Sequence, residues 1–166
     1  MSNSIKKKQG GCSCGFVRYE LETPPLITHC CHCRYCQRQT GAAFALNALF
    51  DSNKVQLISG SVDNISTPSP SGKGQTIARC PKCRVAIWSS YYMGGIKDLI
   101  KFIRVGTLDN PDQFPPDVHI YTESKQPWVS LSENSVIHEK FYEFKTTWTI
   151  ENNALRKNLL AKSSKK

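Results

Sequence analysis

Eight cysteines lie in three clusters within the first 83 residues, and their spacing indicates metal binding. Short C-x-C and C-x-x-C pairs suit a metal because a tight turn aims two thiolates at one ion, while the other two ligands come from a distant segment. We interpret two such pairs as one closed zinc site that contributes folding free energy. Its four thiolates are Cys12, Cys14, Cys80 and Cys83.

The middle cluster offers three thiolates, Cys31, Cys33 and Cys36, and no second pair is left to complete it. Three protein ligands on zinc leave a fourth position for water or substrate, as in catalytic zinc sites. We therefore expect two zinc ions per chain, the second in an open site. Neighbouring side chains of an extended chain point to opposite sides, so Cys30 is expected to face away from Cys31. The spacing leaves open a closed site, completed by one of Cys30, His29, His32 or His119.

The formal net charge of +9 is concentrated at the two ends of the chain. Residues 1–8 carry three lysines and residues 156–166 carry five basic residues, with no acid in either segment, so the remaining 147 residues hold 14 bases against 13 acids. Such ends are usually solvated. The body has no stripe of Lys and Arg with interleaved aromatic residues, so we do not expect specific nucleic-acid binding.

The chain contains no run of about 18 apolar residues, and its N-terminus lacks the apolar core of a signal peptide. We expect neither a membrane span nor secretion, but an intracellular protein of the cytoplasm or nucleus, where thiols stay reduced or bind metal. A basic run of three lysines, Lys6 to Lys8, is too short to indicate nuclear import.

Short β-like segments outnumber helical ones along the chain. The segment 26–30 is expected to pair with 16–22 and to deliver the middle cluster. Residues 38–41 form a turn or short helix, 59–75 form a surface loop rich in Ser, Gly and Pro, and 152–162 form a helix. The remaining predicted strands are 42–50, 54–58, 85–92, 100–107 and 119–121. The expected fold is therefore mostly β, with zinc-stabilised antiparallel sheets.

Several motifs together resemble the glutathione-dependent formaldehyde-activating enzyme family. They are Gly11-Cys12-Ser13-Cys14-Gly15, Cys31-His32-Cys33-Arg34-Tyr35-Cys36 with Thr40-Gly41, Cys80-Pro81-Lys82-Cys83, Gly106-Thr107-Leu108-Asp109 and His119-Ile120-Tyr121. The resemblance covers about residues 9–132 and implies a β-tent-type fold, a four-cysteine structural zinc and a three-cysteine zinc where chemistry occurs. One departure is Arg84, since the family usually has Gly after the second cysteine of that turn.

This resemblance divides the chain into three parts. Residues 1–8 are expected to be a flexible basic tail, 9–132 the zinc-binding domain, and 133–166 a C-terminal extension with a short helix and a basic end.

The implied activity is that of a carbon–sulfur lyase acting on a glutathione adduct, or on another thiol adduct, such as S-hydroxymethylglutathione. Three thiolates donate strongly to zinc and weaken its Lewis acidity, so delivery of the substrate thiol as thiolate is favoured over activation of the carbonyl. Centromere protein V resembles the same family. The alternative function is therefore a non-catalytic zinc scaffold whose basic ends bind acidic partners such as chromatin or the cytoskeleton.

Three further side chains are candidates for the site. His119 has an ordinary pKa near neutrality and is our candidate general acid and base, although a hydrogen-bonded strand histidine fits equally well. Arg34 and Arg38 could pair with the two carboxylates of a glutathione-like ligand, or could be solvated surface residues. Trp128 and Tyr121 could wall the pocket or lie in the core.

Overall fold

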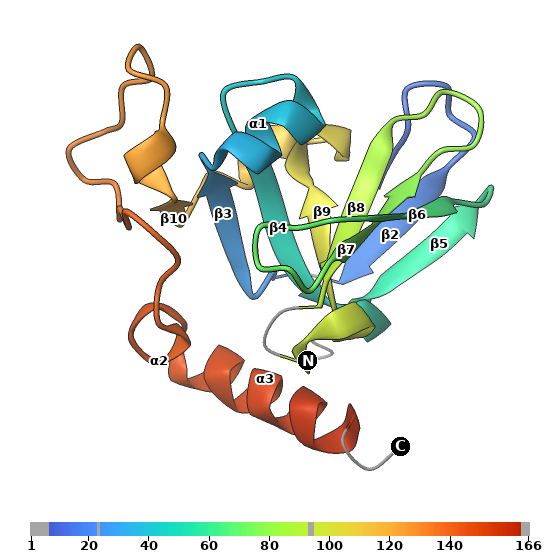
Figure 1. Ribbon diagram of the computed structural model, residues 1–166. Coiled ribbons are helices and arrows are strands. Elements are labelled where there is room, and N and C mark those ends of the chain that lie inside the picture. The colour runs from blue at the N-terminus through green and yellow to red at the C-terminus, as the bar shows by residue number, and fades with distance from the viewer. Residues whose placement is uncertain (1–6, 23, 93–94, 164–166) are drawn as a thin grey trace.

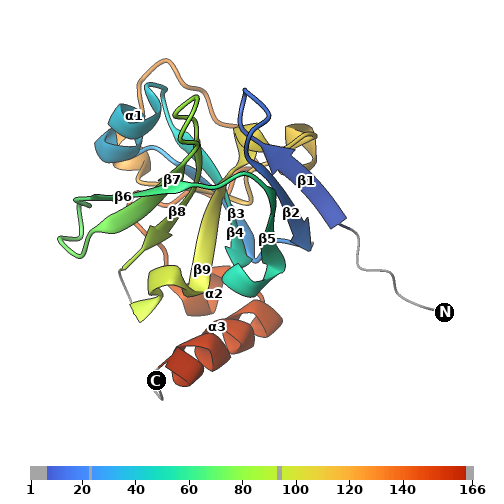
Figure 2. The same ribbon diagram turned by 90° about the vertical axis from the view of Figure 1, so that its right-hand side faces the viewer.

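The computed structural model describes residues 7–22, 24–92 and 95–163, which fold into two β-sheets with few helices. The smaller sheet has the order β1-β2-β5, and the larger has the order β10-β3-β4-β9-β8-β7-β6 (Figures 1 and 2). Neighbouring strands are antiparallel, except that β10 runs parallel to β3. The predicted mostly β fold is confirmed, with one sheet mixed.

The strands are β1 (Lys7–Gly11), β2 (Arg18–Glu22), β3 (Ile27–Cys31), β4 (Ala45–Asp51), β5 (Val55–Ser59), β6 (Asp63–Thr67), β7 (Gln75–Arg79), β8 (Ala86–Tyr91), β9 (Ile100–Arg104) and β10 (Val118–Ile120). The α-helices are α1 (Arg34–Thr40), α2 (Phe144–Thr147) and α3 (Ile150–Ser163). Short 3₁₀ turns are η1 (Ser52–Lys54), η3 (Lys97–Leu99), η4 (Val105–Thr107), η5 (Pro111–Gln113) and η6 (Thr122–Ser124).

Two predictions about the strands were wrong. The segment 26–30 does not pair with 16–22, because β3 is buried along its whole length and lies between β4 and β10 in the larger sheet. The predicted loop 59–75 contains β6, which pairs with β7. This edge strand leaves polar side chains exposed, so its sequence resembles that of a loop.

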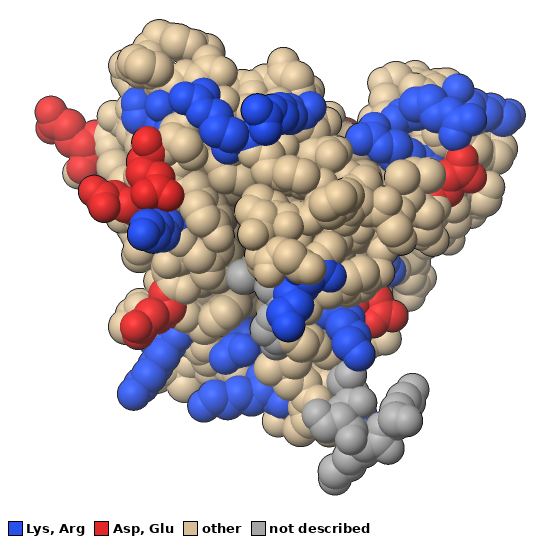
Figure 3. Space-filling model, viewed as in Figure 1, with Lys and Arg blue, Asp and Glu red and all other residues tan. Residues whose placement is uncertain are grey.

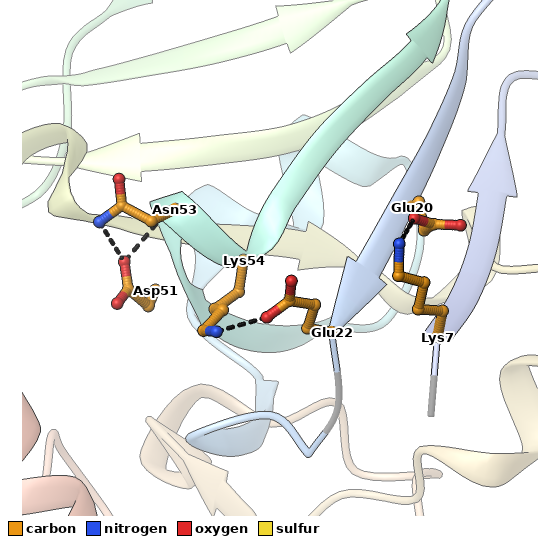
Figure 4. A network of polar contacts seen from close by, with 6 residues as sticks. All are labelled: Lys7, Glu20, Glu22, Asp51, Asn53 and Lys54. Carbon is orange, nitrogen blue, oxygen red and sulfur yellow. Dashed lines mark hydrogen bonds and ion pairs between the residues drawn. The ribbon is translucent and has the colours of Figure 1, made fainter. Parts of the chain in front are cut away.

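The N-terminal basic segment takes part in the smaller sheet. Residues 1–6 lie outside the described part of the chain, and β1 begins at Lys7, which the sequence had assigned to a flexible tail. Lys7 Nζ lies 2.7 Å from Glu20 Oε1 on β2, and Lys54 pairs with Glu22 at the other side of that strand (Figure 4). Such surface ion pairs contribute little to stability.

A buried core joins the two sheets. Tyr19 and Leu21 of β2, and Val17 just before it, are fully buried. The Tyr19 hydroxyl lies 2.7 Å from Thr107 Oγ1, beyond β9. Gly10 is required beside it, since an added Cβ would lie 2.4 Å from the Tyr19 hydroxyl. The smaller sheet is therefore held firmly against the larger one.

The C-terminal extension covers one end of the larger sheet, opposite the end that carries α1 (Figures 1 and 2). Tyr142, Trp148 and Leu159 are buried there against side chains of β9 and η3. Helix α3 confirms the helix predicted over 152–162. Among the described helices, none has the length and apolar character needed to cross a membrane.

Candidate metal centres and the adjoining cavity

Two tight turns bring the four predicted structural cysteines together. The sulfur atoms of Cys12, Cys14, Cys80 and Cys83 all lie within 4.8 Å of one another. Cys12 Sγ is 3.4 Å from Cys14 Sγ, which is 3.8 Å from Cys80 Sγ. Tetrahedral zinc with bonds of about 2.3 Å separates its sulfur ligands by about 3.8 Å. The donor set and its spacing therefore fit a structural zinc ion.

The two turns have the same backbone pattern, which is one N–H donated by the first cysteine and one residue at positive φ. In the first, Cys12 N–H donates to Val17 O (3.1 Å), and Gly15 adopts φ +75°. In the second, Cys80 N–H donates to Val85 O (3.0 Å), and Arg84 adopts φ +65°. Arg84 thus takes the left-handed conformation that glycine adopts without strain, and the turn is retained despite the departure from the family pattern.

The middle cluster lies where β3 leads into α1. The sulfur atoms of Cys31, Cys33 and Cys36 lie within 4.8 Å of one another. Cys33 is the N-cap of α1, and its Sγ accepts a hydrogen bond from Cys36 N–H (3.3 Å). Hydrogen bonds, first from Cys31 and then from Cys36, lower the pKa of Cys33 to about 3. Cys33 therefore favours the thiolate, which is the form that binds zinc, whereas the pKa values of the Cys31 and Cys36 thiols are raised in the absence of an ion.

Cys30 belongs to a different group and faces away from Cys31, as predicted. Its Sγ lies 3.5 Å from His32 Nε2, which lies 3.0 Å from His119 Nδ1. Burial raises the pKa of the Cys30 thiol to about 12 and lowers the pKa of His32 to about 4. Within the described part of the chain, none of the three residues joins the Cys31 cluster.

His29, another candidate for a closed site, also stays apart from the three thiols. Its ring is buried, which lowers its pKa to about 3, and its Nε2 pairs with the Tyr142 hydroxyl. The three-cysteine cluster is thus left without a fourth Cys, His, Asp or Glu ligand among the described residues. This arrangement fits zinc with one position free for an exchangeable ligand.

The three thiols line a cavity of about 500 Å³. Its wall is mostly aromatic and aliphatic, and Arg34, Arg38 and Glu123 lie at its exposed rim. The loop between β6 and β7 crosses in front of β4 and supplies part of the wall (Figure 1). The Phe and Tyr side chains that line it are Tyr35, Tyr91, Phe102, Tyr121, Phe141 and Phe144.

A second, shallower hollow shares both arginines with this cavity. It runs along α1 and is otherwise lined by polar and small residues, together with Trp128, which is 72% exposed. Trp128 Nε1 donates to Gln126 Oε1 (2.6 Å), which fixes the indole beside the groove. In the space-filling view, basic side chains gather over α1 (Figure 3). The two hollows adjoin at Arg34 and Arg38; we call the first the apolar chamber and the second the polar groove.

The fold places the remaining predicted site residues in different surroundings. Tyr121 lines the cavity with its backbone at φ +55°, a strained conformation for a tyrosine. Trp128 lines only the polar groove. His119 lines neither hollow, because alternation along β10 turns its ring toward His32. Sequence reasoning missed Phe141 and Phe144, which lie in the extension to which it assigned no site role.

This chain is similar in part to known proteins and to one family model. The chain is 24% identical over 134 residues to a putative glutathione-dependent formaldehyde-activating enzyme of Halomonas elongata, covering 74% of this chain and 80% of that protein. A crystal structure of a Rhodobacter sphaeroides protein aligns with a TM-score of 0.46 and 17% identity, covering 61% of this chain and 87% of that one. The family model described as glutathione-dependent formaldehyde-activating enzyme matches residues 7–124, which is more than half of the chain. The chain therefore belongs to the glutathione-dependent formaldehyde-activating enzyme family.

Proposed function

We propose that this protein is a zinc-dependent carbon–sulfur lyase that makes or cleaves a glutathione adduct such as S-hydroxymethylglutathione. The observation that carries the proposal is the convergence of Cys31, Cys33 and Cys36 on the wall of a cavity, with no fourth ligand among the described residues. A closed structural site needs four ligands, whereas a site of three beside a cavity suits a substrate thiol.

Two zinc ions per chain follow from the two cysteine groups. Cys12, Cys14, Cys80 and Cys83 would hold the structural ion, and the three cavity thiols would hold the second. An ion held there would favour the thiolate form of an incoming thiol at neutral pH. We place this activity in a reducing intracellular compartment, cytoplasm or nucleus, where thiols stay available to bind metal.

The arginines at the mouth supply recognition of the peptide part of the adduct. Arg34 and Arg38 line both the groove and the cavity, and both are exposed. Glutathione carries two carboxylates, which guanidinium groups bind bidentately. We assign the peptide to the groove beside α1, so that its sulfur reaches the three-thiol cluster.

The reaction itself needs a proton to move from sulfur to oxygen. The thiol loses its proton, its sulfur forms a bond to the carbonyl carbon, and the carbonyl π electrons move to the oxygen, which takes up a proton. The lyase direction reverses each step. Tyr121 is our candidate to donate a hydrogen bond to that oxygen, because it lines the cavity and burial raises the pKa of its hydroxyl, which stays protonated.

His119 remains the alternative proton carrier predicted from the sequence. Its ring contacts His32 rather than the cavity, so a role in positioning the β3–α1 junction fits its surroundings better.

The test is the exchange of formaldehyde and glutathione with their adduct, followed by NMR on zinc-loaded protein. We expect acceleration over buffer by the wild type, loss of acceleration in Cys31→Ser, and retention in Cys30→Ala, the matched neighbour whose thiol faces the other way. Retained folding of Cys31→Ser is checked by circular dichroism. If the wild type accelerates nothing and both zinc ions resist a mild chelator equally, the scaffold function replaces this one.

A further inference from the structure

The chamber behind the three thiols is larger and more apolar than a one-carbon substrate requires. Its aromatic wall is continuous from ring to ring. The Tyr91 and Phe102 centroids are 4.8 Å apart, and His29 lies 6.3 Å from Phe102 and 6.0 Å from Phe141. Phe141 lies 5.6 Å from Phe144. Such edge-to-face and tilted contacts build a stable apolar surface.

Charged side chains are confined to the rim of this chamber. Arg34, Arg38 and Glu123 are the charged residues that line it, and all three are exposed. Burying the carboxylates and the ammonium group of glutathione deep inside would leave those charges unpaired, which is costly. The peptide therefore suits the groove, and the inner chamber is left for the part of the adduct that comes from the carbonyl compound.

The extension supplies a firmly held part of this wall. Phe141 and Phe144 lie beyond residues 7–124, where the family model matches. Between and after them, Tyr142 and Trp148 are buried, and Trp148 Nε1 donates to the Tyr142 hydroxyl (2.6 Å). The Arg156 guanidinium of α3 lies 4.2 Å from the centre of the Phe144 ring. The C-terminal extension thus completes the chamber wall, and its buried residues share one core with the strands of the larger sheet.

We infer that the preferred substrate is a glutathione adduct of a bulky apolar aldehyde, with an alkyl chain of several carbons or an aryl group, and that the formaldehyde adduct is a poorer one. Phe141 and Phe144 are the specificity-determining residues. The inference rests on the proposed function and keeps its chemistry. A glutathione S–H bond and the aldehyde π bond are exchanged for one C–S and one O–H bond, and no other reactant is consumed.

Binding tests the inference independently of turnover. S-hexylglutathione and S-methylglutathione share the peptide and differ by five methylene groups. The ratio of their Kd values, measured by calorimetry on zinc-loaded protein, therefore reports the contribution of the chamber alone. We expect the hexyl compound to bind at least about tenfold more tightly, since each buried methylene adds to affinity. Equal Kd values for the two compounds would overturn the inference.

A matched pair of variants locates the preference. Phe144→Ala should reduce the hexyl preference by about tenfold and leave S-methylglutathione binding unchanged. Ile58→Ala, at an exposed apolar residue of β5 in the smaller sheet that lines neither hollow, should leave both unchanged. If Phe144→Ala does not fold, Phe141→Leu, which keeps an apolar side chain, replaces it as the wall variant in the binding comparison. A hexyl preference that persists in the wall variants would also overturn the assignment.

Turnover separates failure of this inference from failure of the proposed function. Adduct exchange is measured with glutathione and either formaldehyde, hexanal or phenylacetaldehyde. Greater acceleration for the two larger aldehydes supports the inference. Acceleration greatest for formaldehyde overturns it and leaves the proposed function intact. Acceleration of none of them refutes the proposed function, and the binding comparison then still decides whether the chamber takes an apolar group.

Discussion

His32 Nε2 lies 3.0 Å from His119 Nδ1, and the two rings are nearly parallel, with centroids 5.3 Å apart and planes inclined by 24°. His32 is 0% exposed and separates two of the cavity cysteines in sequence, while His119 comes from the neighbouring strand β10. Gln37 Nε2 and Ser124 Oγ both donate to His32 O. Packing and hydrogen bonds thus fix the residue that connects Cys31 to Cys33.

Substitution of His119 distinguishes positioning from acid–base catalysis. His119→Asn keeps a hydrogen-bonding atom near the Nδ1 position, whereas His119→Ala removes it. We expect His119→Ala to lower the free energy of unfolding by about 1–2 kcal/mol and His119→Asn to lower it less. Both should keep the wild-type pH profile of kcat. A hundredfold fall in kcat for His119→Asn, with one limb of the pH profile lost, would instead identify a proton carrier.

Chelation should separate the two proposed zinc ions. We expect about two zinc ions per chain by elemental analysis of protein purified without chelator, one of which leaves on brief exposure to a mild chelator. The easily lost ion is that of the three-thiol site, because three protein ligands hold it less tightly than four. Cys36→Ser should already lack it, and Cys30→Ala should not. Loss of both ions at the same rate would contradict an open site.

Cys80→Ser should remove the structural ion and, with it, cooperative folding. Cys80 is fully buried, and its group joins the turn before β2 to the turn before β8. Unfolded chains rarely preform such a site, so the binding free energy of the ion is folding free energy. We expect the thermal transition of Cys80→Ser to broaden or vanish, as measured by calorimetry. A wild-type Tm with one zinc fewer would show that the core holds without this site.

Arg84→Gly should stabilise the protein by roughly 0.5–1 kcal/mol, because glycine adopts positive φ without the strain that an L side chain incurs. The change also removes an ion pair in which Arg84 Nη1 lies 2.7 Å from Asp63 Oδ2, with side chains 67% and 44% exposed. Such exposed pairs contribute little. Asp63→Asn measures that contribution alone in urea denaturation. Destabilisation by Arg84→Gly beyond that of Asp63→Asn would refute the argument from strain.

The grouping of the cysteines could be predicted from sequence because local backbone rules determine it. A C-x-C or C-x-x-C turn aims its own two sulfurs, and strand alternation separates Cys30 from Cys31. The order of the strands was harder to predict from the sequence. The pairing of β3 with β10 joins residues about 90 positions apart, and no local pattern encodes it.

The aromatic chamber was not predictable for the same reason. Phe141 and Phe144 follow no metal motif, and it is the contacts of His29 with Phe141 and Tyr142 that show the extension returning to β3. A run of aromatic residues after residue 140 was the available signal, since so many large rings require a surface to pack on. The side to which His119 points depended likewise on the register of β10 with β3, which the sequence alone does not determine.

Arg38→Gln tests the assignment of the peptide to the groove. If the Arg38 guanidinium pairs with a carboxylate of glutathione, its loss should raise KM for glutathione about tenfold with kcat nearly unchanged, because the contact holds substrate and transition state alike. The wild-type KM should also rise with ionic strength, and that dependence should weaken in Arg38→Gln. Lys157→Gln on α3 removes an equal charge far from the groove and is the matched control. Equal KM values for both variants and the wild type would make Arg38 a solvated surface residue.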